Sequence, residues 1–177
     1  AGVQSISVSL PQVTGGIGVI GTVTLDKAAG VGDTVVNLAS SLTGVAVVDA
    51  AVTVPEGATI ATYDIDANPV ATATSVSITA SIYETSQSAL VTVQSPTPSS
   101  VTWSVSPVVG GTSTTGTISI SGPAPAGGTT VALASSSLSA LVASSVTIPA
   151  GAMTATFTVS TNVVSNDTSA VISATVY

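Results

Sequence analysis

Apolar and polar residues alternate along most of this chain, which is the pattern of β-strands with one buried face. Ile78, Ala80 and Ile82 are a clear example, and Gly, Pro, Asp and Asn gather between such segments as turn signals. No stretch has the spacing of three and four residues that an amphipathic helix needs. The pattern predicts an all-β protein, whose first half has strands near residues 5–10, 20–26, 34–39, 45–48, 51–54, 58–66, 75–83 and 88–94.

The second half of the chain repeats the first, because residues 5–83 reappear as residues 100–177. The offset between the copies is 95 positions at first and 94 after one deletion, as in the pairs Ser5 and Ser100, Gly21 and Gly116, Asn68 and Asn162, and Ile78 and Ile172. A repeat of this length exceeds the roughly 20–50 residues of solenoid units, so each copy is expected to be a domain with its own core.

Seven or eight strands in about 90–100 residues fit two packed antiparallel sheets with Greek-key connections. We therefore predict two tandem immunoglobulin-like Greek-key β-sandwiches, with domain 1 over residues 1–94, a Pro-rich linker over 95–99 and domain 2 over 100–177. Segment 88–94 has no counterpart after the second copy. The second domain is accordingly expected to lack its last strand.

Composition limits the function classes. With 45% hydrophobic residues the chain has enough material for two cores, yet no apolar run reaches the roughly 20 residues of a membrane-spanning helix. A net charge of −7 with a single basic side chain argues against nucleic acid as a partner. The absence of His and Cys removes the usual general bases, the partners that activate nucleophiles, and zinc ligands. We expect no enzyme, no cofactor and no membrane insertion.

Three blocks of the second copy carry a resemblance to a known family. They read VVGGTSTTGTISISGPAPAGGTTVALASS from Val108, VTIPAGAMTATFTVS from Val146 and TSAVISATVY from Thr168. The chain resembles the bacterial immunoglobulin-like repeats that are strung along exported surface proteins. The resemblance implies an extracellular or cell-surface location and a role as spacer, stalk, adhesin part or filament subunit.

The incomplete second domain suggests how copies of the chain assemble. Without its last strand the sandwich has an acceptor edge with unpaired backbone and exposed apolar side chains, at Ile172, Ala174 and Val176. The alternating segment at the start of the chain is a suitable strand donor for this edge of another copy, through Val3, Ile6, Val8 and Leu10. Head-to-tail repetition does not close on itself. We therefore predict a non-enzymatic homopolymer, the structural subunit of an extracellular surface filament or pilus-like fibre.

Two other functions stay open. The chain could be a two-repeat fragment of a longer surface adhesin or stalk that acts as a spacer, in which the missing strand follows in the same polypeptide. A carbohydrate-binding accessory module is a distant alternative, because the chain has only Trp103, Phe157 and three Tyr to build an aromatic platform. Trp103 is in phase with Val101 and Val105, so we expect it to fill the core.

Two further sites can be named from short motifs. Asp64, Asp66 and Asn68 stand at alternate positions like the first half of a calcium loop, although Pro69 takes the place of its Gly and no Glu closes it. A solvated strand face is the simpler interpretation of these residues. Residues 166–168 form an acceptor sequence for N-glycosylation, which makes Asn166 a candidate for glycan modification.

Overall fold

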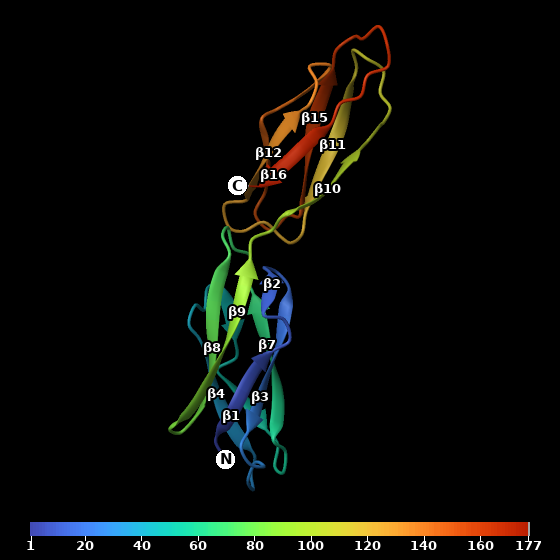
Figure 1. Ribbon diagram of the computed structural model, residues 1–177. Coiled ribbons are helices and arrows are strands. Elements are labelled where there is room, and N and C mark those ends of the chain that lie inside the picture. The colour runs from blue at the N-terminus through green and yellow to red at the C-terminus, as the bar shows by residue number, and fades with distance from the viewer. Residues whose placement is uncertain (177) are drawn as a thin grey trace. The chain divides into compact units, whose positions relative to one another are not determined.

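The computed structural model describes residues 1–176, in which all regular secondary structure is β-strand. It divides into two compact units, Ala1–Ser95 and the residues from Pro96 onward. Each unit is a sandwich of two sheets, which confirms the predicted pair of tandem immunoglobulin-like domains (Figure 1). No helix capable of crossing a membrane occurs in the described part of the chain.

The first domain is built from two sheets with the strand orders β1-β3-β7-β5 and β2-β9-β8-β4-β6. All pairings are antiparallel except that of β2 with β9, which is parallel. The strands are β1 (Val3–Val8), β2 (Gln12–Thr14), β3 (Gly18–Leu25), β4 (Thr34–Ser40), β5 (Ala46–Val48), β6 (Ala51–Val54), β7 (Ile60–Ala67), β8 (Thr74–Ile82) and β9 (Thr85–Gln94).

The second domain has sheets with the strand orders β10-β11-β15-β13 and β14-β12-β16. Its strands correspond in order to β1, β3, β4, β5, β6, β7 and β8 of the first domain. They are β10 (Pro98–Trp103), β11 (Ser113–Ile120), β12 (Thr129–Ser135), β13 (Ala140–Val142), β14 (Ser145–Ile148), β15 (Thr154–Thr161) and β16 (Ile172–Val176). Because β10 begins at Pro98, the last two residues of the predicted linker belong to a strand.

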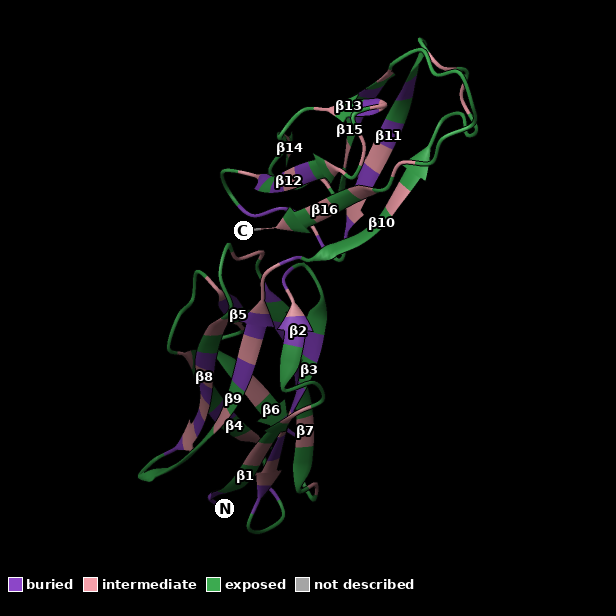
Figure 2. Ribbon diagram, turned by 45° about the horizontal axis from the view of Figure 1, so that its top comes forward, coloured by how far each residue is buried: buried purple, intermediate pink, exposed green. Residues whose placement is uncertain are grey.

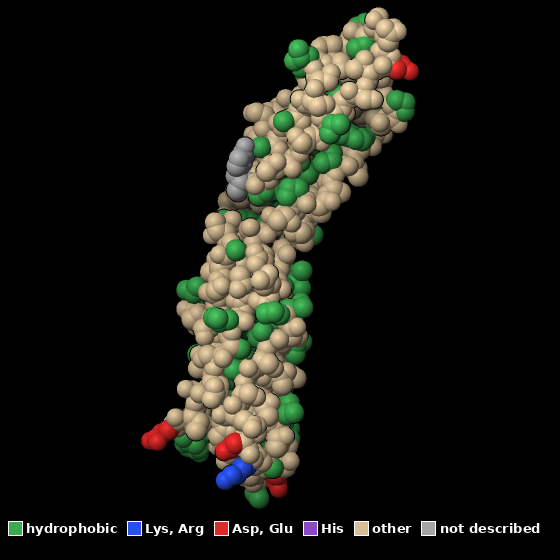
Figure 3. Space-filling model, in the orientation of Figure 1, with side chains coloured by type: hydrophobic (Ala, Val, Ile, Leu, Met, Phe, Trp, Pro, Cys, Tyr) green, Lys and Arg blue, Asp and Glu red, His purple; other side chains and the backbone are tan. Residues whose placement is uncertain are grey.

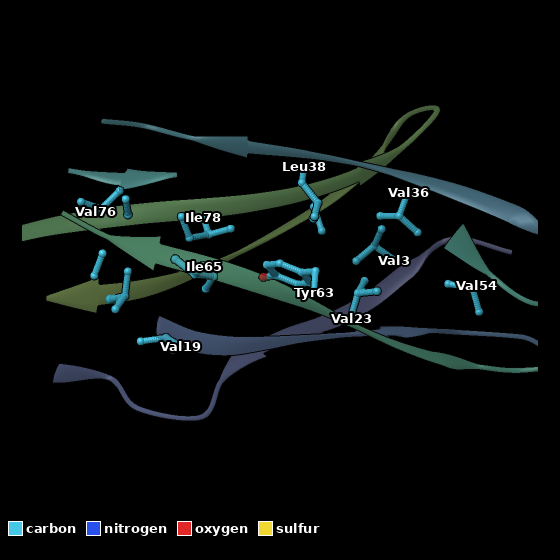
Figure 4. Close-up of a cluster of buried hydrophobic side chains, with 14 of the residues drawn as sticks. Val3, Val19, Val23, Val36, Leu38, Val54, Tyr63, Ile65, Val76 and Ile78 are labelled. Carbon is cyan, nitrogen blue, oxygen red and sulfur yellow. The ribbon is translucent and has the colours of Figure 1, made fainter. Parts of the chain in front are cut away.

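The core of the first domain follows from the alternation along its strands. On β3, for example, Val19, Gly21, Val23 and Leu25 are buried, while the residues that alternate with them face outward or lie half-buried. Figure 4 shows Val23 lying with Ile65 and Ile78 between the sheets, and all three are fully buried. Burying each such side chain contributes roughly 1.5–3 kcal/mol. Since the chain has no Cys, this packing holds the domain together.

A glycine facing an aromatic ring recurs in both domains. Gly21 on β3 pairs with Tyr63 on β7, and Gly116 on β11 pairs with Phe157 on β15. A Cβ at either glycine would collide with the ring opposite. The aromatic side chain therefore covers the bare glycine backbone and takes the space that a side chain there would need.

The predicted strands of the first copy all occur, with ends shifted by up to three residues. The short strand β2 was not predicted. It follows Pro11 directly and has only three residues, too few for alternation to register.

Candidate functional site

Strand β16 forms an open edge of its sheet. It pairs with β12 on one side, where Ile172 lies opposite Ser135 and Ala174 opposite Leu133. On its other side no strand is present within residues 1–176. Its counterpart β8 lies inside its sheet instead, between β4 and β9. In residues 1–176 the second domain is therefore an immunoglobulin-like sandwich whose β16 sheet has three strands, without counterparts of β9 and β2.

The open edge leaves the apolar face of β16 only partly covered. In the first domain Ile78, Ala80 and Ile82 are at most 5% exposed, whereas the matching Ile172, Ala174 and Val176 are all half-buried. Figure 2 shows buried bands on β8 and β9, and bands that are exposed or intermediate on β16. In residues 1–176 the first core holds nineteen buried apolar residues and the second only nine. Strands β9 and β2 contribute only Val91, Val93 and Val13 to the first core, so their absence does not account for the whole difference in buried residues. Residues of the second domain that would pack against these strands are also more exposed.

A groove of about 790 Å³ lies within the second domain at the start of β16, where Ile172 lines it. One wall is the loop and strand from residues 164–172, and the other is residues 105–110, while Trp103, Ala140 and Val159 line it from the sandwich interior. Apolar side chains are exposed between β16 and β10 in Figure 3. In the first domain the corresponding space is filled by β9 and β2, whose Val91, Val93 and Val13 are buried.

Trp103 forms part of this groove and lies outside the core. Its ring meets Phe157 edge to face, with centroids 6.0 Å apart and an interplanar angle of 80°. It is 38% exposed and belongs neither to the second core nor to the partly buried residues packed against it, so the expectation that it fills the core is wrong.

The predicted strand donor lies in its own domain. Residues Val3, Ile6 and Val8 belong to β1, which pairs with β3, while Leu10 follows the strand and is 47% exposed. Val3 is buried, and Ile6 and Val8 pack against the core from partly buried positions. Donation of this segment to another copy would require β1 to leave β3.

The start of β1 is fixed by a clasp between Gly2 and Asp26. The Gly2 N–H donates to Asp26 Oδ1 at 2.6 Å, and the Asp26 N–H donates to the Gly2 carbonyl at 3.0 Å. The Gly2 N–H lowers the pKa of the Asp26 carboxyl below its usual value. The Val3 N–H also donates to Thr85 Oγ1 at 3.1 Å.

The calcium candidates do not form a cage. Asp64, Asp66 and Asn68 all face outward at the end of β7. Asn68 Nδ2 donates to the Gly44 carbonyl at 3.2 Å, and the matching Asn162 Nδ2 donates to the Leu138 carbonyl at 2.7 Å. This asparagine thus ties a loop to the end of a strand in both domains. Within residues 1–176 no three His, Cys, Asp or Glu side chains gather as metal ligands would.

The glycosylation candidate Asn166 is exposed in the loop between β15 and β16. Its backbone carbonyl accepts a hydrogen bond from Thr168 Oγ1 at 3.1 Å, and both residues line the groove. A glycan at Asn166 would stand at the mouth of the groove.

Sequence reasoning missed the second wall of the groove, residues 105–110. The repeat aligns Val108 with Val13, so this wall could have been found from the sequence. The alignment points to a wall only once β2 is known to pair with β9. The hydroxyl of Tyr63 was also not singled out. It is buried without a hydrogen-bond partner, and burial raises the pKa of Tyr63 to about 12.

Two solved structures similar to this chain are domain pairs of intimin. The D0-D1 domain of intimin is 15% identical, with 99% of this chain and 92% of that chain covered and a TM-score of 0.44. The D00-D0 domain of intimin is 14% identical, with 98% of each chain covered and a TM-score of 0.38. No protein-family model matches the chain, and no curated protein matches it. The assignment to the immunoglobulin-like fold rests on the strand order itself.

Proposed function

We propose that this chain is a non-enzymatic structural module of an extracellular surface filament or stalk, and that a β-strand from another copy, or from further along a longer polypeptide, completes its second domain at β16. One observation carries the proposal: Ile172, Ala174 and Val176 lie half-exposed where their counterparts in the first domain are buried. Added to this edge, a strand would cover those side chains and pair the free backbone groups.

The edge carries none of the features that protect sheet edges from pairing. Residues Ile172–Val176 read ISATV, without charge or proline. Natural edge strands that stay unpaired are commonly blunted by Lys, Pro or a bulge. An unprotected edge beside a groove lined by both apolar and neutral polar side chains favours strand addition.

In the filament form, the strand comes from the N-terminal segment of the next copy. Ile6, Val8 and Leu10 alternate as a donated strand would. The cost is the loss of the β1–β3 pairing and of the clasp between Gly2 and Asp26. The contact joins two different surfaces, so its repetition produces a fibre.

In the stalk form, the strand follows further along one longer polypeptide, and the two domains act as a spacer. The observation in favour of this form is that β1 already has its place on β3. Such a chain would stay monomeric when its own array is complete.

An assembly assay tests the proposal and separates the two forms. The filament form predicts that the chain forms fibres with rising concentration, seen by sedimentation and electron microscopy, and that Ile172→Asp prevents them. Val163→Asp is the matched control, because Val163 is 84% exposed nearby and does not line the groove. Equal assembly of both variants would contradict strand addition at β16. A parent chain that stays monomeric at every concentration would exclude the filament form and favour the stalk form.

A further inference from the structure

We propose that the groove of the second domain binds an extended segment of the β9 type. This segment runs antiparallel to β16 and to the residues 168–171 that lead into it, and parallel to residues 107–109, with two apolar side chains facing inward opposite Ala170 and Thr168. The inference rests on the proposed strand addition at β16 and specifies which kind of strand is added and in which direction.

The first domain contains the complete form of this arrangement. Strand β9 pairs antiparallel with β8, so that Val91 lies opposite Val76 and Val93 opposite Thr74. Its other edge pairs in parallel with β2, where Val93 lies beside Val13. Val91 and Val93 are fully buried. The strand is thus held along both edges and by two inward side chains.

The second domain keeps both partners of the absent strand. By the offset of 94, Thr74 and Val76 correspond to Thr168 and Ala170, and by the offset of 95, Val13 corresponds to Val108. Thr168, Ala170 and Val108 all line the groove. The groove is therefore lined by the residues that correspond to both neighbours of β9, although neither Thr168 and Ala170 nor Val108 lies in a strand while the groove is open.

The second wall could take up the same parallel pairing if its backbone became extended, because residues 107–109 do not form a strand as β2 does. In the first domain the Thr92 N–H donates to the Pro11 carbonyl at 2.8 Å, and the Gly15 N–H donates to the Gln94 carbonyl at 3.3 Å. Pairing of this kind uses every second residue, so Gln12 is passed over. Pro107, the counterpart of Gln12, is therefore no obstacle, while Ser106 and Gly110 supply the carbonyl and the N–H.

The position that β1 occupies in the first domain is already filled in the second. Strand β10 already occupies that position, with Trp103 opposite Gly116 on β11 as Val8 lies opposite Gly21 on β3. The vacant position beside β16 is that of β9, while residues 107–109, which correspond to β2, are present without forming a strand. The occupant is accordingly an extended peptide with β-branched residues at two alternate positions and a polar residue between them, as in Val91, Thr92 and Val93 of β9.

The side chain opposite Ala170 can be larger than the one in the first domain. Where Val91 packs against Val76, the second domain offers the smaller Ala170, and Trp103 borders the groove with an exposed ring. We expect Ile or Leu at this position of the strand to bind more tightly than Val, because it fills more of the groove.

Peptide binding tests the inference, with Trp103 as the reporter. Trp103 is the only Trp of the chain and is 38% exposed, so a strand that covers it shifts its emission to shorter wavelength. The probe is the peptide TSQSALVTVQ, the sequence of β9, and it is expected to give a saturable shift. In the control peptide, Ser replaces both inward Val residues. Its affinity is expected to be lower than that of the β9 peptide by a factor of at least about ten.

Direction is measured with a nitroxide on either end of the peptide. With the label after its last residue, NMR signals of Val108 and Thr168 should broaden, since Val93 would lie between them. A label before the first residue should leave both signals sharp. The reverse pattern would overturn the proposed direction.

A second peptide, AGVQSISVSL, distinguishes the inference from the proposed function. If it binds the groove and the β9 peptide does not, the β9-type strand is wrong while strand addition at β16 stands. If neither peptide binds, a chain with residues 84–94 repeated after residue 177 is decisive, because the tether raises the effective concentration to about the millimolar range. No rise in the unfolding midpoint reported by Trp103 in that chain would overturn both.

Discussion

At the scale of single residues, the aromatic side chain in each sandwich shows how small differences between the copies affect stability. Tyr63 and Phe157 occupy matching places over Gly21 and Gly116, but only Tyr63 buries a hydroxyl, which has no partner. Leaving a buried polar group unpaired costs about 1–3 kcal/mol. The second copy avoids this cost with Phe157.

The Tyr63→Phe variant should therefore be more stable than the parent. We expect the free energy of unfolding of the first domain to rise by about 1 kcal/mol at neutral pH, because the unpaired hydroxyl is removed while the ring still covers Gly21. Urea unfolding followed by circular dichroism measures the change. A loss of stability would show that the hydroxyl is satisfied after all.

The same residue makes stability depend on pH in the alkaline range. Burial raises the pKa of Tyr63 to about 12, whereas an exposed tyrosine loses its proton near 10. The folded state therefore holds the proton more tightly, and its contribution is complete below pH 10 and lost as pH rises from 10 to about 12. Unfolding curves at pH 9 and 11.5 should show this decline in the parent and much less of it in Tyr63→Phe. Tyr83→Phe is the control that should keep the decline, since Tyr83 is 99% exposed.

Two glycines on β3 give a matched pair of substitutions. A Cβ at Gly21 would collide with the ring of Tyr63, whereas a Cβ at Gly18 meets nothing within 4 Å. We expect Gly21→Ala to destabilise the first domain by roughly 1–3 kcal/mol through overpacking, and Gly18→Ala to be close to neutral. Equal urea midpoints for the two variants would be inconsistent with the ring lying over Gly21.

At the scale of strands, alternation and the internal repeat were sufficient to predict most of the fold. They predicted eight strands of the first domain and, because segment 88–94 has no second counterpart, the open edge at β16. They did not predict β2, since three residues after a proline carry too little pattern. Because the parallel pairing of β2 with β9 joins segments far apart in the sequence, the second wall of the groove followed only from the structure.

The incomplete sheet should make the second domain the weaker one. Fewer apolar side chains are buried around β16 than around β8, and burial is the main stabilising term in a chain without disulfides. In urea, the transition seen by Trp103 emission, which reports only the second domain, should come at lower concentration than the unfolding of the first domain seen by circular dichroism. Coincident transitions would argue that β16 is not an exposed edge in solution.

At the scale of the whole molecule, the feature that bears on the proposed function is the nearly neutral lining of the groove. Its single Lys, eight acidic residues and lack of His leave the groove with Asp167 as its one charged side chain among the described residues. This suits the binding of a neutral, alternating strand. The filament and stalk forms differ only in where that strand comes from.

Removal of residues 1–10 distinguishes those forms at this scale. If the segment is the donor, the shortened chain should form no fibres under conditions in which the parent does, because nothing is left to fill the groove of the neighbour. Because β1 also belongs to its own sandwich, the test needs a second variant, Asp26→Asn, which weakens only the clasp at Gly2. Fibres that persist without residues 1–10 would exclude this segment as the donor.

The most direct measurement of the central claim is amide hydrogen exchange in β16, resolved by residue, with and without an added strand. In the monomeric chain without an added strand, the β16 amides that face the open edge should exchange much faster than their counterparts in β8. With the β9 sequence tethered after residue 177, their protection should rise towards that of β8. If β16 is already as protected as β8 in the monomeric chain, or if tethering leaves its exchange unchanged, the account of an edge completed by strand addition is wrong.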